Sequence, residues 1–210
     1  MSNCLSNTLM PWLMDHTSDS AAMATARTET LTNIQGEILE IGFGCGHSLK
    51  HYPKETKKLV AIDCNARMLA KASKRIVASS IEVNALIADA SNIPFANDSF
   101  DCVVSHMTLC SVKDIKATLL EISRVLKPKG CFIFLEHGAS TNSKTRFWQN
   151  CWNPVQKFIS DGCNCNREID TLIKEAGYEI HELKYYHMGD APKVLDFMYQ
   201  GSATINPLNH

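Results

Sequence analysis

Short apolar runs alternate with longer amphipathic segments along most of this chain. Five runs rich in β-branched and other apolar residues are predicted as strands: residues 37–42, 59–63, 84–89, 100–106 and 131–137. These runs are apolar almost throughout and do not alternate with polar residues, so we expect strands that are covered on both faces. Such strands are typical of a mainly parallel sheet.

The segments between the strands show helical periodicity. Apolar residues recur at helical spacing over residues 65–77 and 112–126, which predicts two crossover helices. We expect the second helix to stop at the segment 127–130, Lys-Pro-Lys-Gly, because proline cannot continue a helix and glycine permits a reversal. Residues 146–159 and 167–176 are predicted as two further helices.

Two more runs near the C-terminal end, residues 178–186 and 194–204, are predicted as an antiparallel pair that brings the sheet to seven strands. The fold class is therefore α/β, with helices on both sides of the sheet in three layers. We expect residues 1–33 to form an N-terminal helical lid or appendage, and residues 34–210 to form one domain.

Charge and hydropathy exclude several kinds of partner. The 210 residues include 21 Lys and Arg against 22 Asp and Glu, a formal net charge of -1. No chain-wide field attracts nucleic acid, so we expect no nucleic-acid partner. The apolar runs are too short to cross a bilayer and the N-terminus lacks the pattern of a signal peptide, so we expect no integral membrane segment and a cytoplasmic location.

Nine cysteines are scattered along the chain, mostly inside apolar runs. An odd number in such positions is typical of reduced, packed thiols. The close pair Cys163-x-Cys165 lacks the two-residue spacer of zinc knuckles and has no second pair at ligand spacing, so we expect no metal.

The candidate chemistry starts at a glycine-rich turn directly after the first predicted strand. Gly42, Gly44 and Gly46 stand at alternate positions, where they let the backbone turn sharply and let a ligand approach the amide groups. Asp63 ends the second strand, where a carboxylate can accept hydrogen bonds from ribose hydroxyls. Asp89-Ala90 follows the third strand, where a carboxylate suits an exocyclic adenine amino group. Together these residues indicate an adenosine pocket.

A dinucleotide site is the alternative interpretation of the glycine turn. That fingerprint needs Gly-x-Gly-x-x-Gly, and its third position is His47 when counted from Gly42 or Leu49 when counted from Gly44. Neither residue fits, which makes a nicotinamide-dependent oxidoreductase improbable.

With these motifs in place, the chain resembles the class I S-adenosylmethionine-dependent methyltransferases, in the methyltransferase type 11 group. The resemblance covers residues 36–137 and includes the glycine motif from Glu40 to Gly46, the acid Asp63 and the pair Asp89-Ala90. It implies a Rossmann-like three-layer sandwich, a strand order of 3-2-1-4-5-7-6 and an antiparallel last strand. It also implies S-adenosyl-L-methionine as cofactor and S-adenosyl-L-homocysteine as product. The cofactor-binding residues that we expect are Gly42, Gly44, Gly46, Asp63, Cys64, Met68, Asp89, Ala90 and His106.

Further stretches resemble one branch of that family, the methyltransferase-like thiol S-methyltransferases of the animal endoplasmic reticulum. They are residues 108–113, 134–137, 147–149 and 161–164. That branch carries an N-terminal membrane anchor, and we find no such segment in this sequence, so we do not expect membrane attachment. The resemblance implies a small-molecule acceptor, with a thiol favoured.

Methyl transfer from a sulfonium needs alignment of the acceptor and exclusion of water more than covalent machinery. Candidates near the methyl group lie at the ends of strands four and five: His106, Met107, Glu136 and His137. We predict His106 and Asp161 as catalytic residues, the first as a proton acceptor and the second as a group that orients base or acceptor. A structural histidine and a turn residue before Gly162 are the alternatives. The aromatic segment 147–152 is expected to pack in the core, with a lid over the acceptor as the alternative.

The sequence therefore predicts a cytoplasmic S-adenosylmethionine-dependent methyltransferase that acts on a small thiol. Phospholipid amines, quinones and other small metabolites remain alternative acceptors. A non-catalytic module that binds the adenosyl cofactor is an alternative of a different class. The oligomeric state is left open.

Overall fold

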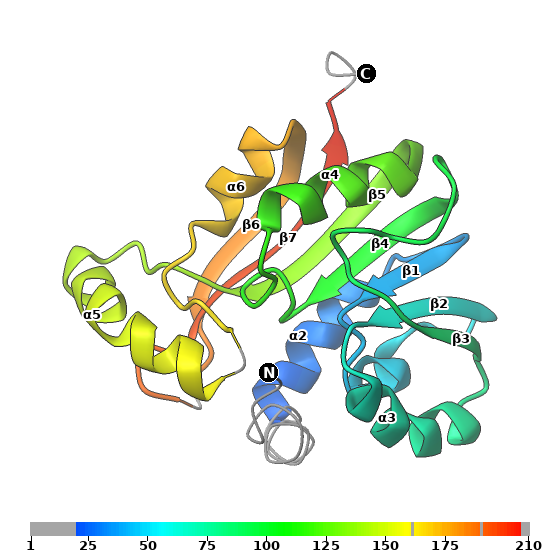
Figure 1. Ribbon diagram of the computed structural model, residues 1–210, viewed down its shortest axis with the longest axis horizontal. Coiled ribbons are helices and arrows are strands. Elements are labelled where there is room, and N and C mark those ends of the chain that lie inside the picture. The colour runs from blue at the N-terminus through cyan, green and yellow to red at the C-terminus, as the bar shows by residue number, and fades with distance from the viewer. Residues whose placement is uncertain (1–19, 161, 190, 207–210) are drawn as a thin grey trace.

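The computed structural model describes residues 20–160, 162–189 and 191–206 (Figure 1). Its centre is a seven-stranded sheet in the order β3-β2-β1-β4-β5-β7-β6. The strands are β1 (Ile38–Ile41), β2 (Lys58–Asp63), β3 (Glu82–Ile87), β4 (Phe100–His106), β5 (Leu126–His137), β6 (Tyr178–His187) and β7 (Phe197–Ile205). The first five strands pair in parallel, and β7 is antiparallel to both of its neighbours. The predicted fold class and strand order are confirmed.

Alternate residues of the central strands pack into two different apolar layers, which is why the strands are apolar throughout. One layer takes Leu39, Val103 and Phe132 together with side chains of helices α4 (Ile115–Val125) and α6 (Ile169–Glu175). The other layer lies on the opposite face of the sheet and takes Ile38, Val104 and Ile133. That face is covered by α2 (Ala21–Leu31), the short 3-10 helix η2 (His47–His51) and α3 (Ala66–Ala78).

Side-chain caps set where the crossover helices begin. The Oδ1 atom of Asn65 accepts hydrogen bonds from the amides of Arg67 and Met68, and α3 starts directly after it. Asp114 caps α4 in the same way by accepting from the amide of Ala117 at 2.9 Å. The predicted start of this helix at residue 112 was therefore too early, because the cap lies two residues further on.

Helix α4 passes directly into β5 at Leu126, whose backbone is already extended. Strand β5 thus includes the segment 127–130 that was expected to be a separate turn, and Lys129 takes a positive φ of 70° inside it. The strand reaches continuous pairing with β4 from Cys131 onwards, where the prediction had placed its start.

The described part of the predicted N-terminal appendage is helix α2, which packs onto the sheet. Met23 and Ala26 share a buried cluster with Leu135 of β5 and Met198 of β7. Residues 1–19 lie outside the described residues, so the lid function of residues 1–33 stays a prediction.

Helix α5 (Ser143–Ile159) contains the aromatic segment that was expected in the core. The expectation was wrong for these rings, because Phe147 and Trp148 are each 61% exposed and Trp152 is 41% exposed. The buried side of α5 is polar and includes Gln149, whose side chain bonds the backbone of Ser140 and Gly138. No helix within the described residues combines the length and the apolar character needed to cross a membrane.

Candidate functional site

The predicted site residues gather at one edge of the sheet because the carboxyl ends of parallel strands point the same way. Gly42 follows β1, Asp63 ends β2, and Asp89 comes two residues after β3. His106 ends β4, and His137 ends β5. We name the two parts of this edge by their expected roles: the adenosyl side, after β1 to β3, and the acceptor side, after β4 and β5.

The three glycines of the turn all have positive φ, at 66° for Gly42, 58° for Gly44 and 77° for Gly46, but they serve different purposes. A Cβ on Gly42 would lie 1.9 Å from the hydroxyl of Thr108, so this position allows the turn to pack against the loop after β4. A Cβ on Gly46 would crowd Phe43 and Ala72. A Cβ on Gly44 would meet no described atom closer than 3.8 Å, so the space beside this backbone can admit a ligand.

Asp63 connects the glycine turn to helix α3. One carboxylate oxygen accepts from the amide of Gly44 at 2.8 Å, and the other accepts from the amide of Asn65 at 2.7 Å. Asp63 is half-buried, which leaves it accessible at the sheet edge.

Asp89 is exposed and uses only one of its two oxygens within the described structure. Oδ1 accepts from the amide and the hydroxyl of Ser91, and these bonds hold the pKa of Asp89 below its ordinary value. Oδ2 has no hydrogen-bond partner among the described residues. The neighbouring Ala90 is buried in the core. Asp89 is thus an ionised carboxylate just after β3, and its Oδ2 atom accepts no hydrogen bond from the described residues.

Two other residues that we expect to bind the cofactor are Cys64, just before α3, and Met68, in the first turn of α3. Cys64 is exposed, and Met68 is half-buried with its sulfur 3.6 Å from that of Cys45 in the glycine turn. The structure therefore brings Met68 to the glycine turn.

Glu40 is a buried acid beneath the glycine turn that the sequence showed only as part of a motif. Its carboxylate accepts hydrogen bonds from the hydroxyls of Ser48 and Tyr52, the second at 2.9 Å. Burial raises the pKa of Glu40 to about 7, although both hydrogen bonds act in the opposite direction.

His106 lies under helix α2 and is only 6% exposed. Its Nε2 is 3.1 Å from the hydroxyl of Thr30, and its Nδ1 is buried without a partner among the described residues. Burial, with smaller contributions from the charges of Arg27 and His51, lowers the pKa of His106 to about 3. The ring is therefore neutral and a weak base, and its predicted catalytic role stays a prediction. Asp161 lies outside the described residues, and its role also stays a prediction.

Glu136 organises the acceptor side. Its Oε1 accepts from the hydroxyl of Ser105 at 2.7 Å and from the amide of Thr108 at 2.9 Å, and its Oε2 accepts from the amide of Cys110 at 3.1 Å. Burial raises the pKa of this carboxyl, and these hydrogen bonds partly offset the effect. Sequence reasoning placed Glu136 near the methyl group, but the structure shows that its carboxylate holds the loop after β4.

Arg167 fixes the same loop through its carbonyl groups, and nothing in the sequence indicated this role. Its guanidinium donates hydrogen bonds to the carbonyls of Leu109 and Val112, the latter at 2.8 Å. Arg167 lies just before the short helix α6, and no sequence pattern around it predicts a contact with the loop after β4.

Comparison with known proteins agrees with this architecture. Residues 39–134 match the family described as a methyltransferase domain. Thiol S-methyltransferase TMT1A from Homo sapiens is 32% identical over 79% of this chain and 72% of its own length. Thiol S-methyltransferase TMT1B from Rattus norvegicus is 30% identical over 73% of this chain and 64% of its own length. A solved S-adenosylmethionine-dependent methyltransferase from Methanosarcina mazei superimposes with a TM-score of 0.65, at 19% identity, over 83% of this chain and 95% of that one.

The sheet order, with helices on both faces, defines a Rossmann-like domain. The chain belongs to the S-adenosylmethionine-dependent methyltransferase family. Within that family it is similar to the two thiol S-methyltransferases.

Alanine at two of the glycines separates packing from backbone strain. We expect Gly44→Ala to lower the free energy of unfolding by about 1–2 kcal/mol, because its positive φ is unfavourable for a residue with a Cβ. Gly42→Ala carries the same strain and also collides with Thr108, which adds ~1–3 kcal/mol. Urea unfolding of both variants tests this order. Equal losses of unfolding free energy in the two variants would show that Thr108 moves aside at no energetic cost.

The buried carboxyl of Glu40 predicts a pH dependence of stability. Its pKa in the folded protein, about 7, lies above its ordinary value of 4.5, so the folded state binds the proton more tightly. The stabilisation is complete below the ordinary value and is lost as the pH rises towards 7. Between about pH 5 and pH 8 we expect the wild type to lose on the order of 2 kcal/mol relative to Glu40→Gln. Urea unfolding of both proteins without ligand measures this difference, and parallel pH profiles would contradict the assignment.

Proposed function

We propose that this chain transfers a methyl group from S-adenosylmethionine to the sulfur of a small thiol. The observation that carries the choice of acceptor is the burial of His106, which is 6% exposed with its Nε2 3.1 Å from the hydroxyl of Thr30; this burial lowers its pKa and makes it a weak base. An alcohol acceptor needs a base that removes its proton, whereas a thiol with a pKa near ~8.5 is partly ionised at neutral pH. The names of the two thiol S-methyltransferases support the same choice.

The adenosyl side fits the cofactor that the family implies. The space beside Gly44 suits close approach of a ligand to the backbone, and the half-buried carboxylate of Asp63 at the end of β2 suits the two ribose hydroxyls. The Oδ2 atom of Asp89 suits the adenine amino group. Gly42 and Gly46 shape the turn, while Cys64, Met68, Ala90 and His106 complete the proposed cofactor-binding set. When bound, S-adenosylmethionine supplies an electrophilic methyl group on a positively charged sulfur.

The protein's own task is then to place the acceptor and exclude water. Glu136 and Arg167 hold the loop after β4 in one conformation, so the acceptor meets a preformed wall. The acceptor sulfur loses its proton to solvent and forms the new bond to the methyl carbon. The bond between the methyl carbon and the sulfonium sulfur breaks, and its electron pair stays on that sulfur. The sulfur atoms of both products, the methylated acceptor and S-adenosylhomocysteine, are neutral thioethers. A cytoplasmic location remains our prediction from the sequence alone.

Asp63 provides a test of the cofactor site. Asp63→Asn removes the charge that strengthens hydrogen bonds to ribose, and charge-assisted bonds contribute ~1.5–3 kcal/mol. We expect S-adenosylmethionine affinity, measured by calorimetry, to fall at least about tenfold with native circular dichroism. Asp98→Asn is the matched control, because Asp98 precedes β4 at the other edge of the sheet and asparagine tolerates its positive φ of 55°. Unchanged affinity in Asp63→Asn would place the ribose elsewhere.

Turnover with defined acceptors tests the proposed reaction. We expect purified protein to release S-adenosylhomocysteine with a short alkyl thiol and to release none with a phosphatidylethanolamine vesicle, a quinol or no acceptor. The thiol rate is expected to rise with pH up to the pKa that the thiol has in the site, because the thiolate is the reacting form. Turnover with the lipid or quinol alone would replace the thiol. Cofactor binding without turnover in any mixture would favour a non-catalytic module.

A further inference from the structure

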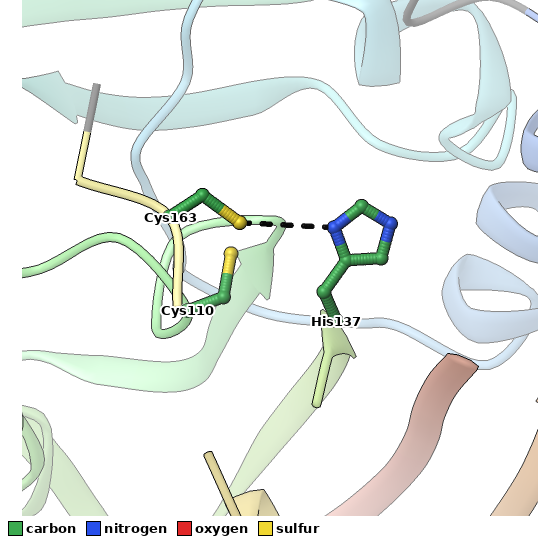
Figure 2. Close-up of side chains that lie close together, drawn as sticks. All are labelled: Cys110, His137 and Cys163. Atoms are coloured by element: carbon green, nitrogen blue, oxygen red, sulfur yellow. Dashed lines mark hydrogen bonds between the residues drawn. The ribbon is translucent and has the colours of Figure 1, made fainter. Parts of the chain in front are cut away.

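Three side chains with soft or nitrogen donor atoms meet on the acceptor side of the site. Cys110 comes from the loop after β4, His137 from the end of β5, and Cys163 from the segment after α5. Their two sulfur atoms and one imidazole nitrogen all lie within 4.8 Å of one another. Figure 2 shows the sulfur of Cys163 facing the imidazole of His137, with the sulfur of Cys110 beside them.

The spacing of these atoms suits a small tetrahedral ion. Zinc bonds thiolate sulfur at about 2.3 Å and imidazole nitrogen at about 2.0–2.1 Å, which places tetrahedral ligands roughly 3.5–3.8 Å apart. The sulfur of Cys163 is 3.9 Å from the Nδ1 atom of His137. A shift of a few tenths of an ångström would bring this pair into ligand geometry.

The backbone around Cys110 is held in place before any ion binds. Glu136 accepts from the amide of Cys110, and the side-chain amide of Asn164 donates to its carbonyl at 3.1 Å. Arg167 binds the carbonyls on both sides of this residue, at Leu109 and Val112. Outer hydrogen bonds of this kind orient metal ligands and reduce the cost of assembling a site.

Cys163 reaches the loop because its neighbours dock there. The amide of Asn164 donates to the carbonyl of Cys110 at 2.8 Å. A Cβ on Gly162 would lie 3.1 Å from the carbonyl of Ser111, and Gly162 also has a φ of 96°, so glycine allows this close approach. The segment that carries Cys163 is thus attached to the loop that carries Cys110.

Burial of the three ligands is uneven, and His137 is the most accessible of them. Cys110 is 1% exposed and Cys163 is 6% exposed, whereas His137 is half-buried. A structural zinc site takes four protein ligands, but a site with three protein ligands keeps one position for an exogenous group. Only three candidate ligands gather here among the described residues.

We propose that Cys110, His137 and Cys163 bind a zinc-like d10 ion whose open fourth position takes the sulfur of the methyl acceptor. This inference rests on the proposed function for the identity of the acceptor, while the metal site stands on its own geometry. Two thiolates and an imidazole select a soft or borderline ion over magnesium or calcium. The proposed site differs from our sequence expectation of no metal. The sequence did not indicate it, because its ligands come from three separate segments.

An ion at this position would hold the acceptor as a thiolate at a pH where most of a free thiol is protonated. A thiol that coordinates the ion loses its proton to solvent and stays bound as a thiolate, so no protein base is needed. Its sulfur keeps lone pairs for the bond to the methyl carbon. The neutral thioether formed by methylation is a weaker ligand than a thiolate, which favours product release.

Cobalt(II) substitution tests the site without any turnover. We expect the full chain, purified under reducing conditions, to bind one Co²⁺ with intense visible ligand-field bands typical of tetrahedral coordination and a thiolate charge-transfer band. Cys110→Ser, His137→Gln and Cys163→Ser should each weaken binding by about 100-fold or more. Cys165→Ser is the matched control, because Cys165 is buried two residues away with its sulfur directed at Gln149 and Asn153 of α5. It should bind Co²⁺ like the wild type.

A short alkanethiol added to the cobalt protein tests the fourth position. We expect the ligand-field bands to shift and the charge-transfer band to grow, with neither change in Cys163→Ser. Absence of stoichiometric Co²⁺ binding, or binding that survives in Cys163→Ser, would overturn the metal site. A Cys110–Cys163 disulfide that persists under those reducing conditions, seen by mass spectrometry, would also overturn it. Ligand-field bands that do not change when the thiol is added would overturn the assignment of the fourth position.

The same preparations separate this inference from the proposed function. Full thiol turnover after chelation to a metal-free protein would refute the metal's role and leave thiol methylation standing. Cobalt and thiol binding without any S-adenosylhomocysteine release would support the site and refute the methyl transfer.

Discussion

A buried carboxylate, Glu136, joins the two sides of this site. It holds the loop after β4 through the amides of Thr108 and Cys110, and Thr108 in turn donates to the carbonyl of Ile41 at 3.1 Å. Gly42 packs directly against that same threonine. Any displacement of the β4 loop would therefore reach both the glycine turn and Cys110.

Burying an acid at this position is costly unless its oxygens are hydrogen-bonded. The structure meets this requirement for Glu136 with one hydroxyl and backbone amides, and for Glu40 with two hydroxyls. The two acids differ in what they hold. Glu40 braces the 3-10 helix below the glycine turn through Ser48 and Tyr52, while Glu136 braces an irregular loop whose amides have no regular partners. Each carboxylate thus fixes backbone that secondary structure alone would not fix.

The sequence predicted those features that depend on local patterns. Strand runs, crossover helices and the glycine turn follow from periodicity and from the special backbone of glycine, so they were placed within a few residues. Errors arose where a tertiary contact decided the outcome. The start of α4 depended on the cap at Asp114, and the aromatic rings of α5 are exposed because the helix buries a polar face. The burial of His106 depended on α2, a helix far away in the sequence.

The acceptor side was the hardest part to predict, because its residues share no motif. Cys110, His137 and Cys163 are separated by more than twenty-five residues each, so no ligand spacing is visible along the chain. The parallel sheet brings the first two together, and the contacts of Asn164 and Gly162 with the loop after β4 add the third. The adenosyl side, by contrast, is built from main-chain turns and acids at strand ends. Changes in the segment after α5 can therefore alter the acceptor side while the sheet and the adenosyl side stay the same.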